Sequence, residues 1–435
     1  MATPELSVVL MVIDERENLE VLLPRLRRIT EELAGAVETI VVDGGSRDGT
    51  PAVAEGLGAT VIRQREPGYG AALREGFAAA HGRWILTLDA DLSHDPDFVA
   101  KLWRQRESAD VVIASRYVTG GVAYMPLHRK WLSRVLNRFF AFGLGLPVAD
   151  LSSGFRLYRA RALRDLALEG KSFDVLEEIL VKAWAAGWRL VEVPFTYFPR
   201  DHGASHARIA RVGAALVRSF GRLWALRSSV ESADYDERAY YSRIPLQRYW
   251  QRRRHRIITR MARGGGSTLD VGCGTSVILQ SLNHAIGLDV QQNKLRYMRR
   301  YGVPLVRGSV MALPFADGAF DCVVCSQVIE HIPDDPAVLA ELGRVVRPGG
   351  LLVLGTPDYA TIGWRTIEPL YGFFAPGGYK DEHITHYTRA SLTEAVVRHG
   401  FAVEDVQYVA QSELILALRK QAPAAAQAAR LAHTS

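Results

Sequence analysis

The sequence predicts an α/β protein of two domains, each built on a parallel sheet with helices on both faces. Two stretches, residues 6–43 and 268–289, each open as a strand, a helical or glycine-rich stretch and a second strand. The length of 435 residues also suggests two or three domains, at roughly 150 residues each. The predicted segments are a first domain over 1–228, a second over 229–420 that opens with a linker or helical lead-in over 229–262, and a flexible tail over 421–435.

Each predicted strand stops at polar residues, which indicates where functional side chains gather. The apolar runs are Leu6–Ile13, Thr39–Val42 and Trp84–Leu88 in the first domain, and Thr268–Val271 and Ala285–Leu288 in the second. A polar helical stretch that ends near Leu33 separates the first two runs. Because ligands of such sheets bind at the carboxyl ends of the strands, we expect the functional residues just after these runs.

Composition excludes several other classes of protein. Hydrophobic residues make up 48% of the chain and charged residues 23%, as in an ordinary folded protein, and three cysteines form no disulfide framework. The first 13 residues do not have the pattern of a signal peptide, and no apolar run reaches the roughly 20 residues of a spanning helix, so we expect a cytoplasmic protein. The net charge of +6 is small and unevenly placed, which argues against nucleic acid as a partner.

Asp89-Ala90-Asp91 is the first candidate site, because it directly follows the apolar run that ends at Leu88. Two carboxylates on one turn can bind a hard divalent cation such as Mg²⁺ or Mn²⁺ carried on a diphosphate. Taken alone, the pair is more often a turn or helix cap.

Further segments place this turn in a known pattern. They are Val41-Val42-Asp43-Gly44-Gly45-Ser46-Arg47-Asp48-Gly49-Thr50, Gly68-Tyr69-Gly70-Ala71-Ala72, Ser115-Arg116-Tyr117 and Ser153-Gly154-Phe155-Arg156. With Asp89-Ala90-Asp91 they make residues 5–227 resemble the family 2 glycosyltransferases of GT-A fold, and most closely the dolichol-phosphate or polyprenol-phosphate sugar synthases. The resemblance implies metal-assisted transfer of a sugar from a nucleotide-diphosphate sugar.

The resemblance also implies roles for single residues. It places Glu15 and Asp43 near the nucleotide, Asp89 and Asp91 at the metal and diphosphate, and Arg116 and Arg200 at phosphate groups. Surface salt bridging is the alternative for Arg116. The chain departs from the family pattern at Met11–Ile13, Gly44, Ser93 and His206.

Two basic segments without acidic residues suggest an acceptor at a membrane. Residues 111–149 contain no Asp or Glu and include several basic residues ahead of the aromatic run 139–144. In residues 207–227, Arg208, Arg211, Arg218 and Arg222 fall on one helical face, opposite apolar residues. We expect this helix to lie on an anionic membrane surface, and packing of its apolar face on the domain core is the alternative.

A lipid phosphate acceptor would need no catalytic base, because its oxygen is already ionised near neutral pH. If the acceptor is instead a saccharide hydroxyl, Asp150 is the best candidate for the base.

The second domain opens with Leu269-Asp270-Val271-Gly272-Cys273-Gly274-Thr275-Ser276, and Asp289 lies 19 residues after Asp270 at the end of the next strand. The pattern continues in four later segments, which are residues 312–315, Phe320-Asp321, Glu330-His331-Ile332 and residues 347–350. Residues 235–418 thus resemble the class I S-adenosylmethionine-dependent methyltransferases, with a Rossmann-like fold. The cofactor residues that the resemblance implies are Asp270, Gly272, Gly274, Asp289 and Ser309, which replaces an aspartate near the adenine.

The spacing of the second domain's histidines and cysteines suggests different roles. His383 and His386 lie where related enzymes bind the methyl acceptor, and either can accept a hydroxyl proton or serve the structure. Cys322 and Cys325, three apart in a predicted strand, point to opposite faces, and we expect both in the core.

Together these features predict a bifunctional enzyme at the inner face of a membrane. One domain would make a polyprenyl-phosphate or dolichyl-phosphate sugar, and the other would methylate an intermediate of the same glycan or lipid pathway. The alternatives are a glycosyltransferase that acts on a saccharide hydroxyl, or a chain in which one domain is a non-catalytic binding module.

Overall fold

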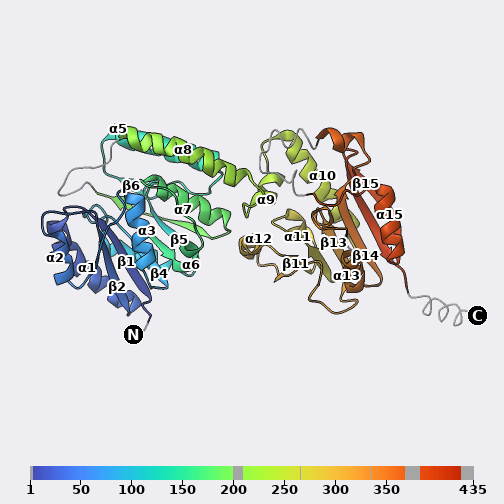
Figure 1. Ribbon diagram of the computed structural model, residues 1–435, viewed down its shortest axis with the longest axis horizontal. Helices are drawn as coiled ribbons and strands as arrows, with labels where there is room; N and C mark the ends of the chain where they lie inside the picture. The colour runs from blue at the N-terminus through green and yellow to red at the C-terminus, as the bar shows by residue number, and fades with distance from the viewer. Residues whose placement is uncertain (1–2, 199–208, 265, 335, 368–382, 423–435) are drawn as a thin grey trace, which may run out of the picture. The chain divides into compact units, whose positions relative to one another are not determined.

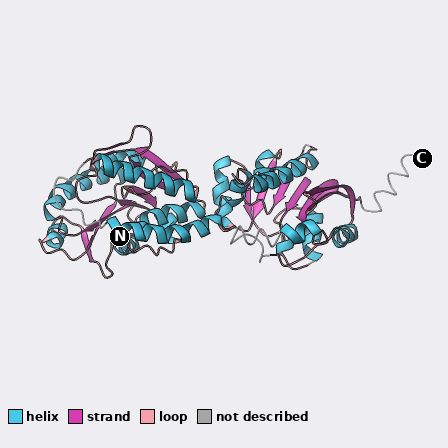
Figure 2. Ribbon diagram, turned by 90° about the horizontal axis from the view of Figure 1, so that it is seen from above, coloured by secondary structure: helices cyan, strands magenta, loops and turns pink. Residues whose placement is uncertain are grey.

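Two seven-stranded sheets form the centres of two units, residues 1–227 and 228–435, which are treated separately below. The structure is a computed structural model, and it describes residues 3–198, 209–264, 266–334, 336–367 and 383–422, with side chains left out at 209–218. Within each unit, helices cover the faces of the sheet (Figures 1 and 2).

The sheet of the first unit has the strand order β3-β2-β1-β4-β7-β5-β8. Its strands are β1 (Leu6–Val12), β2 (Val37–Asp43), β3 (Thr60–Arg63), β4 (Trp84–Thr87), β5 (Val111–Ser115), β7 (Arg156–Arg159) and β8 (Leu190–Pro194). A separate two-stranded sheet joins β6 (Val122–Ala123) to β9 (Thr196–Tyr197). The three predicted strands of this unit are confirmed as β1, β2 and β4.

Helices of the first unit alternate with these strands. They are α1 (Arg16–Ala34), α2 (Thr50–Gly56), α3 (Tyr69–Ala79), α4 (Val99–Arg104), α5 (Leu127–Leu144), α6 (Ala160–Arg164), α7 (Asp174–Ala185) and α8 (Ile209–Ser228). Helix α1 shows why they pack here, because its leucines at 19, 22, 23 and 26 are all buried against the sheet. Figure 1 shows α5 beside α8, and Phe139 and Phe140 of α5 both contact the Phe220 ring of α8.

The sheet of the second unit has the order β12-β11-β10-β13-β14-β16-β15. Its strands are β10 (Thr268–Val271), β11 (Ala285–Asp289), β12 (Leu305–Arg307), β13 (Phe320–Ser326), β14 (Val346–Pro357), β15 (Phe401–Val409) and β16 (Glu413–Lys420). The helices are α9 (Tyr235–Tyr240), α10 (Pro245–Met261), α11 (Val277–Ser281), α12 (Gln292–Met298), α13 (Pro336–Val345) and α15 (Arg389–Arg398). The two predicted strands are confirmed as β10 and β11.

The prediction of wholly parallel sheets is wrong at one strand in each unit. Strand β7 runs antiparallel to β4 and β5, and β16 runs antiparallel to β14 and β15. β7 is only four residues long and begins and ends with arginine, so it has no apolar run that predicts a strand. β16 follows β15 through a tight turn in which Ala410 and Gln411 have φ of 48° and 54°, and a hairpin can only join antiparallel strands.

The predicted lead-in forms α9 and α10, which pack on the second unit. Ile257 and Ile258 of α10 are buried with residues of β13 and β14, and Arg254 donates to both carboxylate oxygens of Glu413 in β16. Cys322 and Cys325 are free thiols in two different apolar clusters, which confirms their prediction as core residues. The predicted tail, from residue 423 on, lies outside the described residues. Over the described part of the chain, no helix is both long and apolar enough to cross a membrane.

Candidate functional site

The turn after β4 carries the two aspartates of the predicted metal site. Asp91 is buried, and its Oδ1 accepts hydrogen bonds from the backbone N–H of Ser93 at 3.1 Å and from the Ser93 hydroxyl at 2.5 Å. Asp89 is half-buried, and the backbone folds back at Leu92, which has a φ of 59°. Ser93, one of the departures from the family pattern, thus orients Asp91. The hard oxygen donors of this pair fit Mg²⁺ or Mn²⁺.

His94 lies directly against this turn, and the sequence did not indicate a role for it. It is buried, stacks on Phe155 and accepts the backbone N–H of Asp89 at Nδ1, at 3.0 Å. Burial lowers the pKa of His94, so the ring is neutral with its proton on Nε2, which lies 3.8 Å from Asp89 Oδ2. A neutral imidazole N–H therefore faces the Asp89 carboxylate and adds no positive charge.

Two glycine-containing motifs of the predicted pattern meet at Asp89. A Cβ built on Gly154 would lie 3.0 Å from Tyr69 Oη and 3.5 Å from Asp89 Oδ1. A Cβ on Gly70 would lie 2.2 Å from the Gly170 carbonyl oxygen. Gly70 is therefore needed because the backbone passes too close for a side chain, whereas a Cβ at Gly154 would press on the Tyr69 hydroxyl.

Asp43 and Glu15 lie on neighbouring loops, because β1 pairs with β2 up to Val12 and Asp43. The Asp43 carboxylate is buried and accepts the backbone N–H groups of Gly45 and Ser46, so it shapes the loop after β2. Glu15 is partly exposed, and its carboxylate accepts a hydrogen bond from the Asn18 side chain. Its backbone N–H donates to the Thr50 hydroxyl. Of the two, the Glu15 side chain is the better placed to meet a ligand.

Gly44, another departure from the family pattern, lies directly beside Ile13. A Cβ on Gly44 would lie 2.5 Å from Cγ1 of Ile13, so the Ile13 side chain fills the space that a larger residue would need. The departures at Ile13 and Gly44 are therefore linked in space.

Arg116 and Asp150 form a buried ion pair at the end of β5. The guanidinium donates Nε to Oδ2 at 2.8 Å and Nη2 to Oδ1 at 2.7 Å, and the Arg116 backbone N–H donates to Oδ2 at 2.9 Å. Although burial opposes ionisation of Asp150, Arg116 lowers its pKa. The Ser152 hydroxyl also donates to Oδ1 at 3.3 Å. An ionised carboxylate that accepts four hydrogen bonds is a poor proton acceptor, so this geometry argues against Asp150 as a general base. Because both side chains are buried, the pair is not a surface salt bridge.

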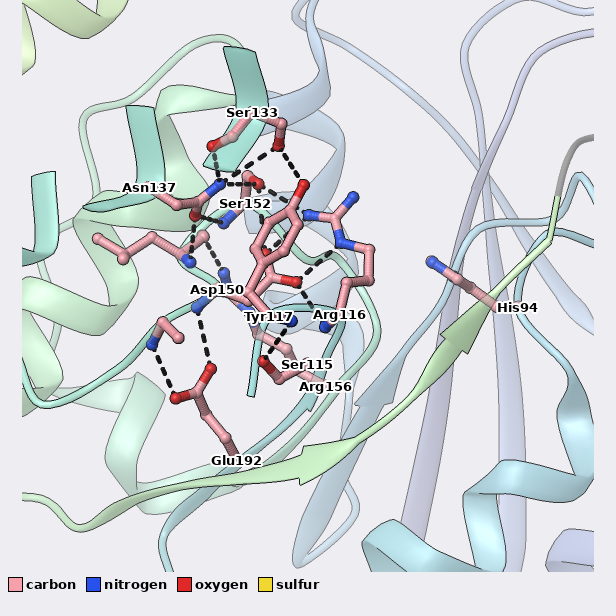
Figure 3. A network of polar contacts seen from close by, with 12 residues as sticks. His94, Ser115, Arg116, Tyr117, Ser133, Asn137, Asp150, Ser152, Arg156 and Glu192 are labelled. Carbon is pink, nitrogen blue, oxygen red and sulfur yellow. Dashed lines mark hydrogen bonds and ion pairs between the residues drawn. The ribbon is translucent and has the colours of Figure 1, made fainter. Parts of the chain in front are cut away.

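A polar network connects this pair to helix α5 (Figure 3). Asn137 of α5 accepts the backbone N–H of Leu151 at 2.6 Å and donates to the Ser152 hydroxyl, which in turn accepts from Arg116. Glu192 of β8 holds the other side of the segment by accepting the backbone N–H of Asp150 at 2.9 Å. The inner face of α5 is thus built into the network around Arg116.

The outer face of α5 is apolar and exposed. Leu127, Trp131, Phe139 and Phe142 have 83%, 68%, 57% and 65% of their surface accessible. Arg129, Lys130, Arg134 and Arg138 lie on the same helix. We call the four apolar residues Leu127, Trp131, Phe139 and Phe142 the α5 apolar face. Such a continuous exposed set is unusual for a soluble surface and marks an interaction site.

On the predicted basic face of 207–227, the structure describes the side chain of Arg222, which forms ion pairs. This side chain pairs with Glu169 at 2.7 Å and with Glu178 at 3.5 Å, so it binds the first unit's own carboxylates. The next residue, Leu223, is fully buried. Arg200 and Arg208 lie outside the described residues, and so do the side chains of Arg211 and Arg218.

In the second unit the glycine loop and Asp289 lie together after β10 and β11. Asp289 accepts the backbone N–H of Gly274 at 2.8 Å, and its other oxygen accepts that of Gln291. Gly272 and Gly274 have positive φ of 67° and 50°, and a Cβ on Gly272 would lie 2.2 Å from Val328 Cγ2. Both positions therefore require glycine.

Asp236 of α9 is a site residue that the sequence analysis missed. Its Oδ2 accepts the backbone N–H of Thr275 at 3.1 Å and lies 3.3 Å from Lys294 Nζ. A Cβ on Gly274 would come within 2.5 Å of the same oxygen. The residue lies 38 positions before Gly274, and no local motif connects the two.

Two serines near this loop serve the backbone. Ser276 caps α11 by accepting the backbone N–H of Ile278 at 3.1 Å, which explains a serine at the third small position. The Ser309 hydroxyl accepts the backbone N–H of Met311 at 3.2 Å in the turn after β12.

Asp270 is buried in β10, and its Oδ2 has no hydrogen-bond partner among the described residues. Burial and the neighbouring Asp289 raise its pKa to about 8. The folded state therefore retains a proton that the unfolded chain, with a pKa near 3.8, loses as the pH rises above 4.

We expect the second unit to lose stability as the pH rises from about 4 to about 8, by up to about 1.4 kcal/mol per pH unit from this group. Asp270→Asn should flatten that slope, because asparagine does not titrate. Chemical denaturation at a series of pH values measures it. An unchanged slope in the variant would contradict the assignment.

His383 follows the undescribed segment 368–382 and contacts Tyr359, with 2.7 Å between Nδ1 and the Tyr359 hydroxyl oxygen. Burial, His331 and His386 lower its pKa to about 4, so the ring is neutral at physiological pH. His386 stacks on the other side, with its ring centroid 4.1 Å from that of Tyr359. The two histidines therefore lie around one tyrosine.

Comparison with known proteins gives a match in each unit. Residues 7–167 match the family described as glycosyl transferase family 2, and residues 269–354 match a methyltransferase domain. The chain is 31% identical over 246 residues to the polyprenol monophosphomannose synthase of Mycolicibacterium smegmatis, a match that covers 53% of this chain and 91% of that protein.

Two further similarities concern the first unit as well. The chain is 34% identical over 212 residues to the dolichol-phosphate mannosyltransferase of Pyrococcus furiosus, a match that covers 46% of this chain and 58% of that protein. A crystal structure of glucosyl-3-phosphoglycerate synthase from Mycobacterium tuberculosis, in complex with Mn²⁺ and UDP, has 22% identity and a TM-score of 0.41. That match covers 52% of this chain and 80% of the crystallised one.

Proposed function

The chain belongs to glycosyl transferase family 2 through its first unit, and from this premise we propose that the unit transfers a sugar from a nucleotide-diphosphate sugar to a polyprenyl or dolichyl phosphate. The second unit is a methyltransferase domain, and we propose that it uses S-adenosylmethionine to methylate an intermediate of the same glycan or lipid pathway. The two relatives named as a mannose synthase and a mannosyltransferase make mannose the first sugar to test.

The observation that carries the proposal is the connection between Arg116 and α5. Arg116 is oriented by Asp150, and a planar guanidinium suits a phosphate group. The same network includes Asn137 and Ser133 of α5, whose outer surface is the α5 apolar face. A lipid phosphate acceptor explains both features at once, because its chain belongs in a bilayer and its headgroup needs a cation.

In the proposed reaction, a phosphate oxygen of the lipid attacks the anomeric carbon of the sugar as the bond to the nucleotide diphosphate breaks. The attacking oxygen is already ionised, so no general base is needed, and Asp150 remains free to orient Arg116. Asp89 and Asp91 would hold Mg²⁺ or Mn²⁺, which neutralises charge on the leaving diphosphate. Glu15 and Asp43 would lie near the nucleotide.

We further propose that the protein is peripheral to the inner face of the membrane, with the α5 apolar face in the lipid interface and the basic residues of α5 at anionic headgroups. Arg222 has no part in this contact, because it is paired with Glu169 and Glu178.

The test is glycosyl transfer by the purified full chain. Nucleotide-activated mannose and other nucleotide sugars are supplied with a polyprenyl phosphate and Mg²⁺ or Mn²⁺, and lipid-linked sugar is measured by mass spectrometry. We expect a lipid-linked product from one donor. Transfer to a soluble saccharide with none to the lipid would overturn the proposed acceptor.

Asp289→Ala tests the proposed cofactor site. We expect S-adenosylmethionine to bind at least about tenfold more weakly, because a charged hydrogen-bond acceptor for the ribose is worth about 1.5–3 kcal/mol. Isothermal calorimetry measures the affinity, and Asp317→Ala is the control, since that aspartate is exposed and pairs with Arg344. Equal affinity in both variants would show that Asp289 does not bind the cofactor.

A further inference from the structure

Buried polar atoms without hydrogen bonds gather at the carboxyl end of β13. Glu330 lies in a short helical turn, residues 329–331, and is fully buried, and in the described part of the chain neither carboxylate oxygen makes a hydrogen bond of normal geometry, although the Thr356 hydroxyl lies beside it. Three more buried side-chain atoms lack a hydrogen-bond partner among the described residues, namely Ser326 Oγ, Gln327 Nε2 and Trp364 Nε1. Each such atom costs about 1–3 kcal/mol, and they are rare in folded proteins. Their concentration here indicates a site that a ligand completes.

Backbone hydrogen bonds hold a second segment against Glu330. The Glu330 carbonyl oxygen accepts the backbone N–H groups of Ile384 at 2.7 Å and Thr385 at 3.0 Å. The Thr385 hydroxyl donates to the Ile332 carbonyl oxygen at 2.6 Å. These contacts bring His383 next to residues more than 50 positions earlier in the chain.

The result is a compact set of metal-ligand atoms. Glu330, His331 and His383 each offer one ligand atom, and these three atoms lie within 4.8 Å of one another. The two imidazole rings have centroids 5.0 Å apart. The Tyr359 hydroxyl contacts His383 Nδ1 at 2.7 Å, as partners outside the ligand set commonly do to orient a metal-binding histidine.

We propose that Glu330, His331 and His383 bind one divalent transition-metal ion, of the class of Zn²⁺, Co²⁺, Mn²⁺ or Fe²⁺. Two imidazole nitrogens and one carboxylate oxygen suit these ions better than Mg²⁺ or Ca²⁺, which prefer oxygen ligands alone. Three protein ligands leave coordination positions open, as in catalytic and unlike structural zinc sites. The ion would also give one Glu330 oxygen the partner that it lacks.

The position of the site suggests what fills the open positions. Val328, two residues before Glu330, packs against Gly272 of the glycine loop, where the cofactor is proposed to bind. An oxygen of the methyl acceptor, such as a sugar hydroxyl, is the ligand that this neighbourhood favours. That assignment rests on the proposed methyl transfer, whereas metal binding does not depend on it.

The test uses Co²⁺ as the probe and the full chain throughout. Equilibrium dialysis gives the stoichiometry and affinity, and the visible absorption of bound Co²⁺ reports nitrogen ligands. An Asp91→Ala background removes an aspartate of the proposed first-unit metal site. In that background we expect one Co²⁺ per chain, with the absorption bands of a site of low coordination number.

Glu330→Gln and His383→Asn should each weaken Co²⁺ binding at least tenfold and remove those bands. His255→Gln is the matched control, because its ring contacts Ser281 in the same unit and lies outside the cluster. Glu330→Gln replaces a buried, unpartnered carboxylate with a neutral group, so we expect that variant to fold.

Absence of Co²⁺ binding in the Asp91→Ala protein would overturn the proposal. So would wild-type affinity in both cluster variants. Binding of S-adenosylmethionine, measured separately by calorimetry, shows whether the proposed methyltransferase function fails independently of the metal.

Discussion

Asp91→Ala is expected to lower glycosyl transfer by about 1,000-fold. Asp91 is buried on the turn after β4 and is oriented by Ser93, so its loss would remove one of two carboxylates of the proposed metal site. Loss of one preorganised electrostatic group commonly costs about 100-fold to 1,000-fold in rate, and loss of a metal ligand belongs at the upper end. Initial rates with saturating donor, measured across a range of Mn²⁺ concentrations, test this.

Two comparisons make the result specific. Asp97 lies six residues after Asp91, is exposed and pairs with Arg25. The Asp97→Ala variant should therefore keep most of the activity. Binding of S-adenosylmethionine should be unchanged in Asp91→Ala, because the glycine loop belongs to the other unit. Normal glycosyl transfer by Asp91→Ala would contradict the metal assignment.

Replacement of Trp131, Phe139 and Phe142 by serine is expected to weaken binding to anionic vesicles by at least about 100-fold. Transfer of a large apolar side chain from water into an apolar environment is worth about 1.5–3 kcal/mol, so three of them exceed the 2.7 kcal/mol of a 100-fold change. All three side chains are more than half exposed, but Phe139 also stacks on Phe220 of α8, so the unfolding free energy of the variant is measured beside its vesicle binding. Vesicle sedimentation at low and moderate salt measures the binding.

The same triple variant separates membrane contact from chemistry. Transfer to a long-chain polyprenyl phosphate in vesicles should fall much more than transfer to a short, water-soluble analogue. The control is a triple serine variant at Ile244, Leu246 and Tyr249, which are equally exposed on the second unit. Equal loss with both acceptors would contradict a lipid-facing role for α5, and so would a parent protein that does not bind vesicles.

The buried pair of Arg116 and Asp150 changes the choice between acceptors. A base for a saccharide hydroxyl must be able to take up a proton, but Arg116 lowers the pKa of Asp150 and occupies both of its oxygens. The same contacts leave Arg116 fixed in direction, and a fixed cation is what binding of a phosphate needs. The pair therefore favours an ionised acceptor.

Features formed by residues close together in the chain could be predicted from the sequence. The five apolar runs became strands β1, β2, β4, β10 and β11, and the two units are of the predicted α/β class. Asp89 with Asp91, and the glycine loop with Asp289, lie just after strands as expected, because a strand's end and its loop are set by local pattern. Motifs of this kind also identified both families.

Features that join distant segments were decided by the tertiary structure alone. Asp150 meets Arg116 across 34 residues, Asp236 reaches Thr275 across 39, and His383 joins Glu330 across more than 50. The outward side of α5 and the pairing of Arg222 with Glu169 were equally hidden, because helical periodicity separates two faces without saying which one the core covers. Sequence determined which residues end each strand, whereas packing determined which charges and rings meet there, since those contacts exist only once the strands are ordered in a sheet.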